Sequence, residues 1–393
     1  MRIINQITWA AAAASFVLAC SSSNQGNGGG TTGGGTTVGL PQAPGGTSPT
    51  QIGPAGTGAP GMQNTGQVPP AGTGTLMGQG GMTGVAGAPT VATGGTAAPG
   101  TGGAAATMPM GGTTDPTMCP AAPAGASMEA TAALAAINAA RVPAGSGCDN
   151  LILTLDMSAL NHCNYYAMNK SNAMCVANAH LEVMSCMGFT GADPGTRMMA
   201  AGYTSRGGGS EVMAFVDNPA SSVAQWINTV FHRIPILDPW TVEMGYGNAT
   251  GCDTIDFGKG TPTTPTSAIV VYPYNGQTNV PTTFDGSHEG PMPPAPSTGW
   301  PSSSPVNIYA QGLTVTDHVI TLDSDTTPID HVWLDATNNT DTSIASFLRS
   351  TAFLYANKPF AANTKYHVRM AGMHTGGAFN LEWTFTTGAT NRF

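Results

Sequence analysis

The segment Val223–Gly247, VAQWINTVFHRIPILDPWTVEMGYG, decides the fold class because two periodicities follow one another within it. Its first part repeats apolar residues at helical spacing, at Val223, Trp226, Ile227 and Val230. Its last part, from Val242 onward, alternates as a half-buried strand does. A helix that leads through a short turn into a strand predicts a mixed α/β domain with Trp226 in its core.

Three further helices are predicted upstream of this segment. Apolar residues recur at helical spacing over 127–141, and the helix is expected to stop before Pro143. Asp156 is predicted to cap a second helix, and Asp193-Pro194 is typical of the start of a third. With the strands that follow, these elements predict an α/β sandwich over residues 119–260.

Six cysteines lie within this region, and their even number indicates three disulfides formed in an oxidising compartment. Fifteen pairings are possible, and the sequence does not choose among them. A zinc site is disfavoured for them because the spacings are irregular and contain no C-x-x-C pair. The six are Cys119, Cys148, Cys163, Cys175, Cys186 and Cys252.

The N-terminal residues 1–19 have the pattern of a secretory signal, with Arg2 followed by an apolar run. The end of the run, Val17–Cys20, resembles a bacterial lipobox, which implies lipidation of Cys20. By the same resemblance Ser21, rather than Asp, favours the outer membrane, so the protein is expected at the cell surface or in the periplasm. The alternative is an ordinary signal cleaved nearby, which would leave Cys20 unmodified.

Residues 20–118 are predicted to form a disordered tether rather than a domain. From Ser21 onward the segment is rich in Gly, Thr, Pro and Ala, contains no aromatic residue and carries one charge, Asp115. A flexible coil of this length would span about 50 to 60 Å. The chain has a net charge of −9 and no basic stripe, which excludes nucleic acid as a partner. Membrane association is therefore expected only through the lipid anchor.

A stiff Thr/Pro linker follows residue 260, and residues 268–388 are predicted to form an all-β sandwich because short strand candidates recur between turn signals. These candidates are Ala268–Tyr274, Val306–Tyr309, Leu313–Val315, His318–Leu322, His331–Leu334, Ala352–Tyr355, Tyr366–Met370 and Leu381–Thr387. The ends of this region resemble bacterial Ig-like modules, at Val271–Pro273, Thr278–Pro281, Ala361–Tyr366 and Trp383–Thr387. Trp383 and Phe385 are expected on the core face.

Three polar residues far apart in sequence form the candidate site: His180, Glu211 and His232. Two imidazoles and a carboxylate would suffice to hold Zn or another divalent metal. Glu182 is a competing carboxylate. His162 is expected on a solvated helix face, without a role in the site.

The region 119–260 resembles the bacterial branch of the CAP or SCP superfamily, the cysteine-rich secretory, antigen and pathogenesis-related proteins. The phrases that carry the resemblance are Ile137–Arg141, Leu155-Asp156, Leu160, His180, Gly188–Gly191, Arg197, Ala201–Tyr203, Glu211-Val212, Trp226–Arg233, Ile236–Pro239 and Glu243–Gly247. The resemblance implies an α-β-α sandwich with an open cleft lined by His180, Glu211 and His232. A second Glu found in animal and plant members is replaced by Thr229.

Binding is favoured over catalysis because the sequence contains neither an H-E-x-x-H helix nor a G-x-S-x-G elbow. The expected function is therefore capture of a divalent metal or of a small-molecule, lipid or peptide-like ligand at the cell envelope. Two alternatives remain open. One is a metal-dependent hydrolase that acts on envelope polymers or proteins, and the other is a passive surface adhesin.

Overall fold

The computed structural model describes residues 115–389, except 205–208, 217, 263 and 340, together with residues 16, 17, 19 and 20 near the N-terminus. These residues belong to one compact unit. Residues 21–114 of the predicted tether and most of the predicted signal lie outside the described residues. None of the described helices is both long and apolar enough to cross a membrane.

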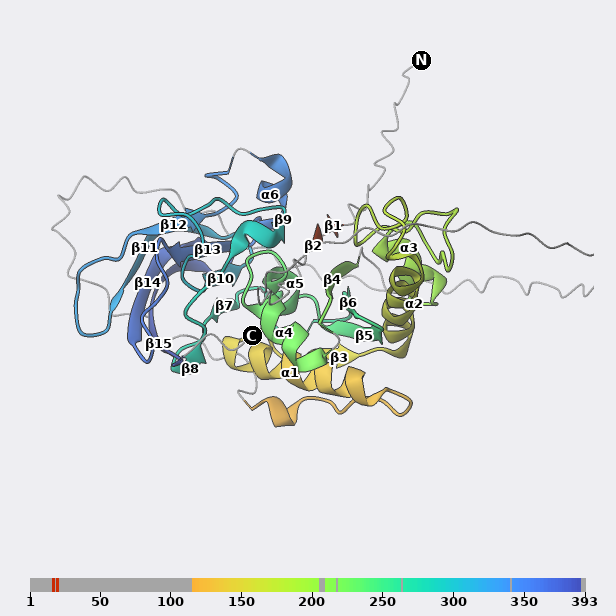
Figure 1. Ribbon diagram of the computed structural model, residues 1–393. Coiled ribbons are helices and arrows are strands. Elements are labelled where there is room, and N and C mark those ends of the chain that lie inside the picture. The colour runs from red at the N-terminus through yellow and green to blue at the C-terminus, as the bar shows by residue number, and fades with distance from the viewer. Residues whose placement is uncertain are drawn as a thin grey trace, which may run out of the picture. The chain divides into compact units, whose positions relative to one another are not determined.

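The region 119–260 contributes four strands to a five-stranded sheet of mixed direction, and the fifth strand comes from residues 16–17 (Figure 1). The central strand β6 pairs antiparallel with β4 on one side and β5 on the other. The outer strands β1 and β3 run parallel to β4 and β5. In spatial order the strands are β1 (Phe16–Val17), β4 (Ser210–Ala214), β6 (Cys252–Gly258), β5 (Glu243–Ala249) and β3 (Asn150–Leu151).

The helices of this region are η1 (Pro116–Met118), α1 (Met128–Ala144), α2 (Leu153–Asn169), α3 (Pro194–Ala200), α4 (Pro219–Ile227) and α5 (Arg233–Leu237). Two predicted boundaries were wrong. Pro143 lies inside the last turn of α1, where Gly145 already caps the final carbonyls and the missing N–H is tolerated. Asp156 lies in the first turn of α2 and does not cap it; its carboxylate instead accepts a hydrogen bond from the backbone N–H of Tyr246.

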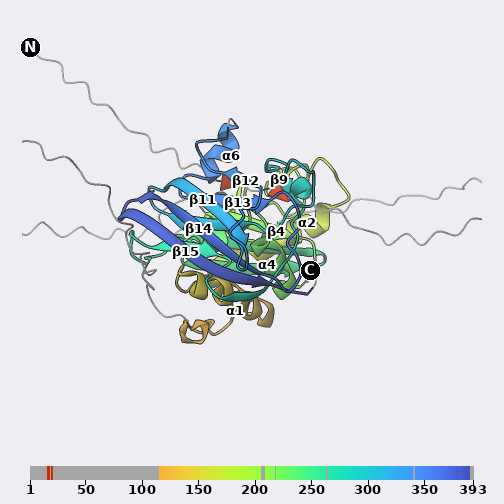
Figure 2. The same ribbon diagram turned by 90° about the vertical axis from the view of Figure 1, so that its left-hand side faces the viewer.

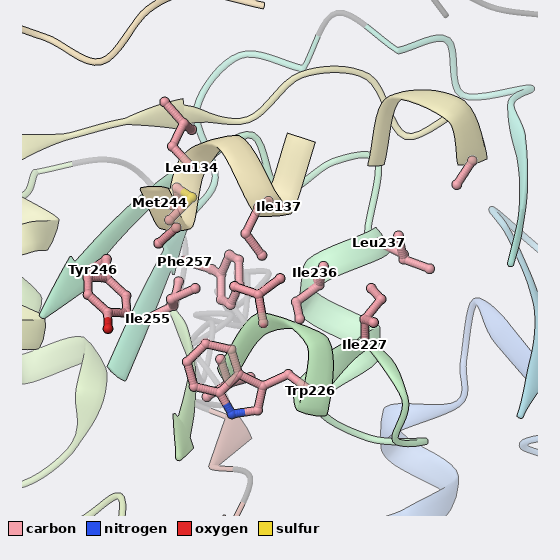
Figure 3. Close-up of a cluster of buried hydrophobic side chains, with 14 of the residues drawn as sticks. Leu134, Ile137, Trp226, Ile227, Ile236, Leu237, Met244, Tyr246, Ile255 and Phe257 are labelled. Atoms are coloured by element: carbon pink, nitrogen blue, oxygen red, sulfur yellow. The ribbon is translucent and has the colours of Figure 1, made fainter. Parts of the chain in front are cut away.

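Helices cover both faces of this sheet. One face packs against α1, α4 and α5, and Trp226 is buried there with its indole N–H donating to Met213 O. Figure 3 shows this cluster, in which Leu134, Ile137, Trp226, Ile227, Ile236, Leu237, Met244, Tyr246, Ile255 and Phe257 meet. The other face packs against α2, and this contact is close because Gly245 and Gly247 have no Cβ to collide with the helix backbone. The predicted α/β class is confirmed.

The C-terminal region contains two four-stranded sheets (Figures 1 and 2). In spatial order one consists of β12 (His331–Leu334), β13 (Thr351–Ala356), β10 (Val306–Ala310) and β7 (Ile269–Tyr272). The other consists of β11 (Thr314–Leu322), β14 (Lys365–His374), β15 (Gly377–Thr387) and β8 (Gln277–Val280). Side chains from both sheets share one apolar core, in which Trp383 and Phe385 are buried as predicted.

The secondary structure of the C-terminal region differs from the prediction in three respects. The two candidates over 313–322 form one strand, β11, which carries an irregularity between Val315 and Asp317. The segment Gln277–Val280 forms β8, which runs parallel to β15. A short helix, α6 (Thr342–Phe347), was not predicted because its six residues are too few to show helical periodicity. Two more short elements, η2 (Gly286–His288) and β9 (Glu289–Gly290), precede β10, and β9 pairs with β2 (Ala19–Cys20).

The predicted disulfide count is confirmed, because all six cysteines form three bonds. Cys163–Cys252 links α2 to β6 across a sequence separation of 89 residues. Cys175–Cys186 closes a loop between α2 and α3. Cys119–Cys148 ties the segment before α1 to the segment before β3.

Candidate functional site

His180 and Glu211 meet on the α2 side of the sheet. His180 lies in the long loop between α2 and α3, where its backbone N–H donates to the side chain of Asn178. Glu211 is the second residue of β4, and both side chains are fully buried. The two atoms His180 Nδ1 and Glu211 Oε1 are 2.7 Å apart. The structure therefore brings together two of the three predicted site residues.

Arg197 of α3 holds this pair in place. Its Nη2 donates to Glu211 Oε2 at 2.5 Å, and its Nη1 donates to the backbone oxygen of His180 at 3.0 Å. Burial by itself would raise the pKa of Glu211, but the charges of Arg197 and His162 and the hydrogen bond from His180 hold that pKa well below its ordinary value. Glu211 is therefore an ionised acceptor with both oxygens engaged.

The expectation that His162 is solvated was wrong. Its side chain is buried, with Nδ1 2.9 Å from Glu182 Oε1 and Nε2 2.8 Å from the backbone oxygen of Ala179. The same Nε2 lies 3.7 Å from Glu211 Oε1. The face of α2 that carries His162 packs on the sheet, and that tertiary contact decided its burial. Glu182 therefore supports His162 and is not a rival partner of His180.

Asp256 adds a second carboxyl beside Glu211. The two residues stand opposite each other in the register of β4 and β6, and Asp256 is fully buried. Burial and then the neighbouring charge of Glu211 raise the pKa of Asp256 well above its ordinary value, against the effect of Arg197. The protonated form of Asp256 is favoured as a result, while Glu211 carries the negative charge.

His232 lies beyond the end of α4 and has a different carboxylate partner. Its Nδ1 is 3.2 Å from Oε1 of Glu289, which lies in β9, and 3.4 Å from the hydroxyl of Thr229. Burial lowers the pKa of His180 against the raising effect of Glu211, and the charges of His232 and His162 add to the lowering. His232 thus interacts electrostatically with His180, although the two imidazoles have separate carboxylates.

The tautomer of His180 follows from its partner. Because the ionised Glu211 can only accept, His180 Nδ1 carries the proton, and the lone pair of the neutral ring is on Nε2. This Nε2 is buried and has no hydrogen-bond partner among the residues that the structure describes. A buried acceptor without a partner is costly in a folded protein, so this atom is a candidate for contact with a bound species, as are the carboxyl oxygens of Asp256, which have no partner there either.

A metal held by three protein ligands does not fit this arrangement. Within the described residues, no group of three or more His, Cys, Asp or Glu side chains is arranged to hold a metal ion. Both oxygens of Glu211 are engaged, so this residue orients His180 and does not face a metal. Each of the two imidazoles, of His180 and of His232, has a carboxylate on its Nδ1 side.

In the part of the chain that the structure describes, the three predicted residues are exposed by only 0–1%, so the expected open cleft is not seen at them. β1, which lies within the predicted signal, runs beside β4 with Val17 opposite Glu211, and Glu289 lies against His232. A cavity of about 490 Å³ lies elsewhere, along α2, where Asp156, Met157, Leu160 and Tyr246 line it. Burial raises the pKa of Asp156 to about 6.

Sequence reasoning missed two carboxyls of the site. Asp256 had a local signal, because residues 254–257 alternate between polar and apolar as a strand does. Glu289 had no local signal, because it lies in a Pro- and Gly-rich segment outside any predicted strand.

No family model matches the chain, and no curated protein is significantly similar to it.

Proposed function

We propose that the protein binds a divalent metal ion such as Zn²⁺ at the cell envelope, through the imidazoles of His180 and His232. The observation that carries the proposal is His180 Nε2, a buried acceptor that has no partner among the described residues. Neutral imidazole nitrogen is a preferred ligand of zinc.

The surroundings of His180 support this role. A ligating histidine commonly donates its other ring nitrogen to a carboxylate, which fixes the tautomer and makes the ligating nitrogen more basic. Glu211 occupies that position at 2.7 Å, and Arg197 fixes Glu211 in turn. The lowered pKa of His180 keeps its ring neutral at pH 7, which is the form that binds metal.

Binding is favoured over hydrolysis by the state of the two nearby carboxyls. Glu211 has both oxygens engaged, and the raised pKa of Asp256 favours its neutral form. A general base must be ionised and within reach of a water molecule, so neither carboxyl is suited to that task. The metal would leave positions open for a small-molecule or peptide-like ligand.

The proposal also covers the family of the α/β region, the domain type of the C-terminal region and the location of the protein. A sheet covered by helices on both faces is what a CAP-like domain requires, and two four-stranded sheets with a common core suit an Ig-like module. Three disulfides are typical of an exported protein. We infer that lipid on Cys20 attaches the mature chain, which lacks residues 1–19 and therefore β1, to the outer membrane, and that residues 20–118 serve as its tether.

The test is a calorimetric titration of the purified full-length chain, first stripped with chelator, with Zn²⁺ alone. One ion per chain is expected to bind, and His180→Ala and His232→Ala are each expected to weaken the affinity at least tenfold. His367→Ala is the matched control, because His367 lies on β14, partly exposed, beside Glu382. If His180→Ala binds Zn²⁺ as tightly as the wild type, the proposal is wrong.

A second measurement identifies the ligand type. Co²⁺ in place of Zn²⁺ is expected to give visible absorption bands that change in intensity when either histidine is replaced. An unchanged spectrum in both variants would place the ion elsewhere in the chain.

A further inference from the structure

The carboxylate beside His232 comes from the other half of the chain. Glu289 is separated from His232 by 57 residues and follows the Thr/Pro linker that was predicted to divide the two domains. Its side chain is nevertheless only 2% exposed. A carboxylate is rarely buried unless it has partners, so its contacts show what holds it.

Glu289 accepts hydrogen bonds from three consecutive backbone N–H groups. Val230 N lies 3.2 Å from its Oε2, and Phe231 N and His232 N lie 2.5 Å and 3.3 Å from its Oε1. The side chain of His232 adds a contact at 3.2 Å between Nδ1 and Oε1. One carboxylate thus fixes both the backbone that carries His232 and the orientation of its ring.

Polar contacts on either side of His232 also cross between the two halves. Arg233 donates from Nη1 to the backbone oxygen of Pro305 at 2.6 Å, and its guanidinium lies 4.9 Å from the centre of the Tyr272 ring. Asn228 donates to the backbone oxygen of Thr283 and accepts from the hydroxyl of Ser304. The segment 228–233 is therefore held from the C-terminal half along its whole length.

Apolar contacts reinforce this docking. Val230 and Phe231 are fully buried, and they belong to a cluster whose other members come from the C-terminal half. Those members are Phe284, Leu334, Ile344, Leu348, Phe353 and Tyr355. The position of His232 is consequently fixed by a core that the N-terminal half does not contain by itself.

We propose that Glu289 is a positioning residue of the metal site, so that the C-terminal half completes a site which the α/β half only begins. This inference rests on the proposed function, because Glu289 is assigned the same role behind the metal-binding imidazole of His232 that Glu211 has behind His180. Each imidazole has a carboxylate on Nδ1, and each Nε2 is directed away from that carboxylate by ring geometry.

The alternative is that Glu289 serves only to satisfy three backbone N–H groups. Thr229 allows the two roles to be separated, because its hydroxyl already lies 3.4 Å from His232 Nδ1 and a carboxylate at this position would reach the ring. Thr229→Glu in a chain that lacks the Glu289 carboxylate would restore a charged partner to the ring, but it would not restore the hydrogen bonds of Glu289 to the backbone.

The experiment uses the full-length chain with Glu289→Gln, Glu289→Asp and the double variant Thr229→Glu/Glu289→Gln, titrated with Zn²⁺ alone. Glu289→Gln is expected to lower the Zn²⁺ affinity about 10- to 100-fold, the range for loss of a carboxylate behind a ligating histidine. In Glu289→Asp and in the double variant, the decrease in the logarithm of the Zn²⁺ affinity is expected to be at most half of that in Glu289→Gln. Glu382→Gln is the matched control, since Glu382 lies beside a histidine on the exposed face of β15.

Nitrogen-15 NMR of the histidine rings in the metal-free chain provides a readout that does not depend on metal. The wild type is expected to show His232 protonated at Nδ1, and Glu289→Gln is expected to change the His232 signals while those of His180 stay unchanged. If wild type binds no Zn²⁺ but the His232 ring responds, the proposed function fails and the orienting role of Glu289 stands. An unchanged His232 ring, or wild-type Zn²⁺ affinity in Glu289→Gln, overturns the inference.

Discussion

The two histidine–carboxylate pairs differ in what holds them. The pair His180–Glu211 lies within the α/β region, and a buried guanidinium, Arg197, balances its charge. The pair His232–Glu289 joins two halves of the chain, and backbone N–H groups surround its carboxylate. The first pair should therefore depend on charge balance, and the second on the docking of the two halves.

The largest expected effect is the loss of the cation behind the first pair. Arg197→Met would leave Glu211 buried with an uncompensated charge, which is expected to lower the free energy of unfolding by about 3–5 kcal/mol. Urea denaturation followed by circular dichroism measures this change. Arg369→Met removes a half-exposed guanidinium beside Asp317 and is expected to cost less than about 1 kcal/mol. Equal losses in the two variants would contradict the charge-balance argument.

The second pair should respond to a change at the docking contact. Arg233→Lys keeps the positive charge but loses the fork that reaches Ile227 O and Pro305 O together, so unfolding is expected to become easier by about 2 kcal/mol. Limited proteolysis of the linker over 261–266 should also accelerate. If the linker is cleaved at the wild-type rate, the two halves do not depend on this contact.

The first pair should also impose a pH dependence, through Asp256. The pKa of Asp256 is raised in the folded state, so Asp256 binds a proton more tightly there than in the unfolded chain. Its contribution to stability is therefore complete at low pH and declines progressively as the pH rises above about 4. While Asp256 stays protonated in the folded protein, the free energy of unfolding of the wild type should fall by about 1.4 kcal/mol per pH unit relative to that of Asp256→Asn. Denaturation of both proteins between pH 4 and 7 measures the difference. If the difference in free energy of unfolding between the two proteins does not change over this pH range, Asp256 is ionised in the folded state.

The smallest effect is expected at Thr229. Its hydroxyl donates to Trp226 O and lies near His232, but Glu289 remains the main partner of that ring. Thr229→Ala should therefore change the free energy of unfolding by about 0.5–1 kcal/mol and the Zn²⁺ affinity by less than about twofold. A loss of affinity as large as that of Glu289→Gln would transfer the orienting role to Thr229.

Prediction from sequence succeeded where the signal was local. The helix capped at Asp193 and the strand His331–Leu334 were placed correctly, because capping residues and alternation act over a few positions. The burial of His162 was missed, because its helix buries a face that includes polar residues. Glu289 was missed for a different reason, since the backbone groups that hold its carboxylate lie 57 to 59 residues away in the sequence.

The sequence by itself determined the α/β class of residues 119–260, the strand-rich region that follows, the presence of three disulfides and the burial of Trp226. These features follow from periodicity, from an even cysteine count and from the strong tendency of large apolar side chains to be buried. Tertiary structure alone decided which cysteines pair, which carboxylate meets each histidine, and that Asp256 stands beside Glu211. Such pairings depend on which surfaces fit together after the chain has folded, and no local pattern records that fit.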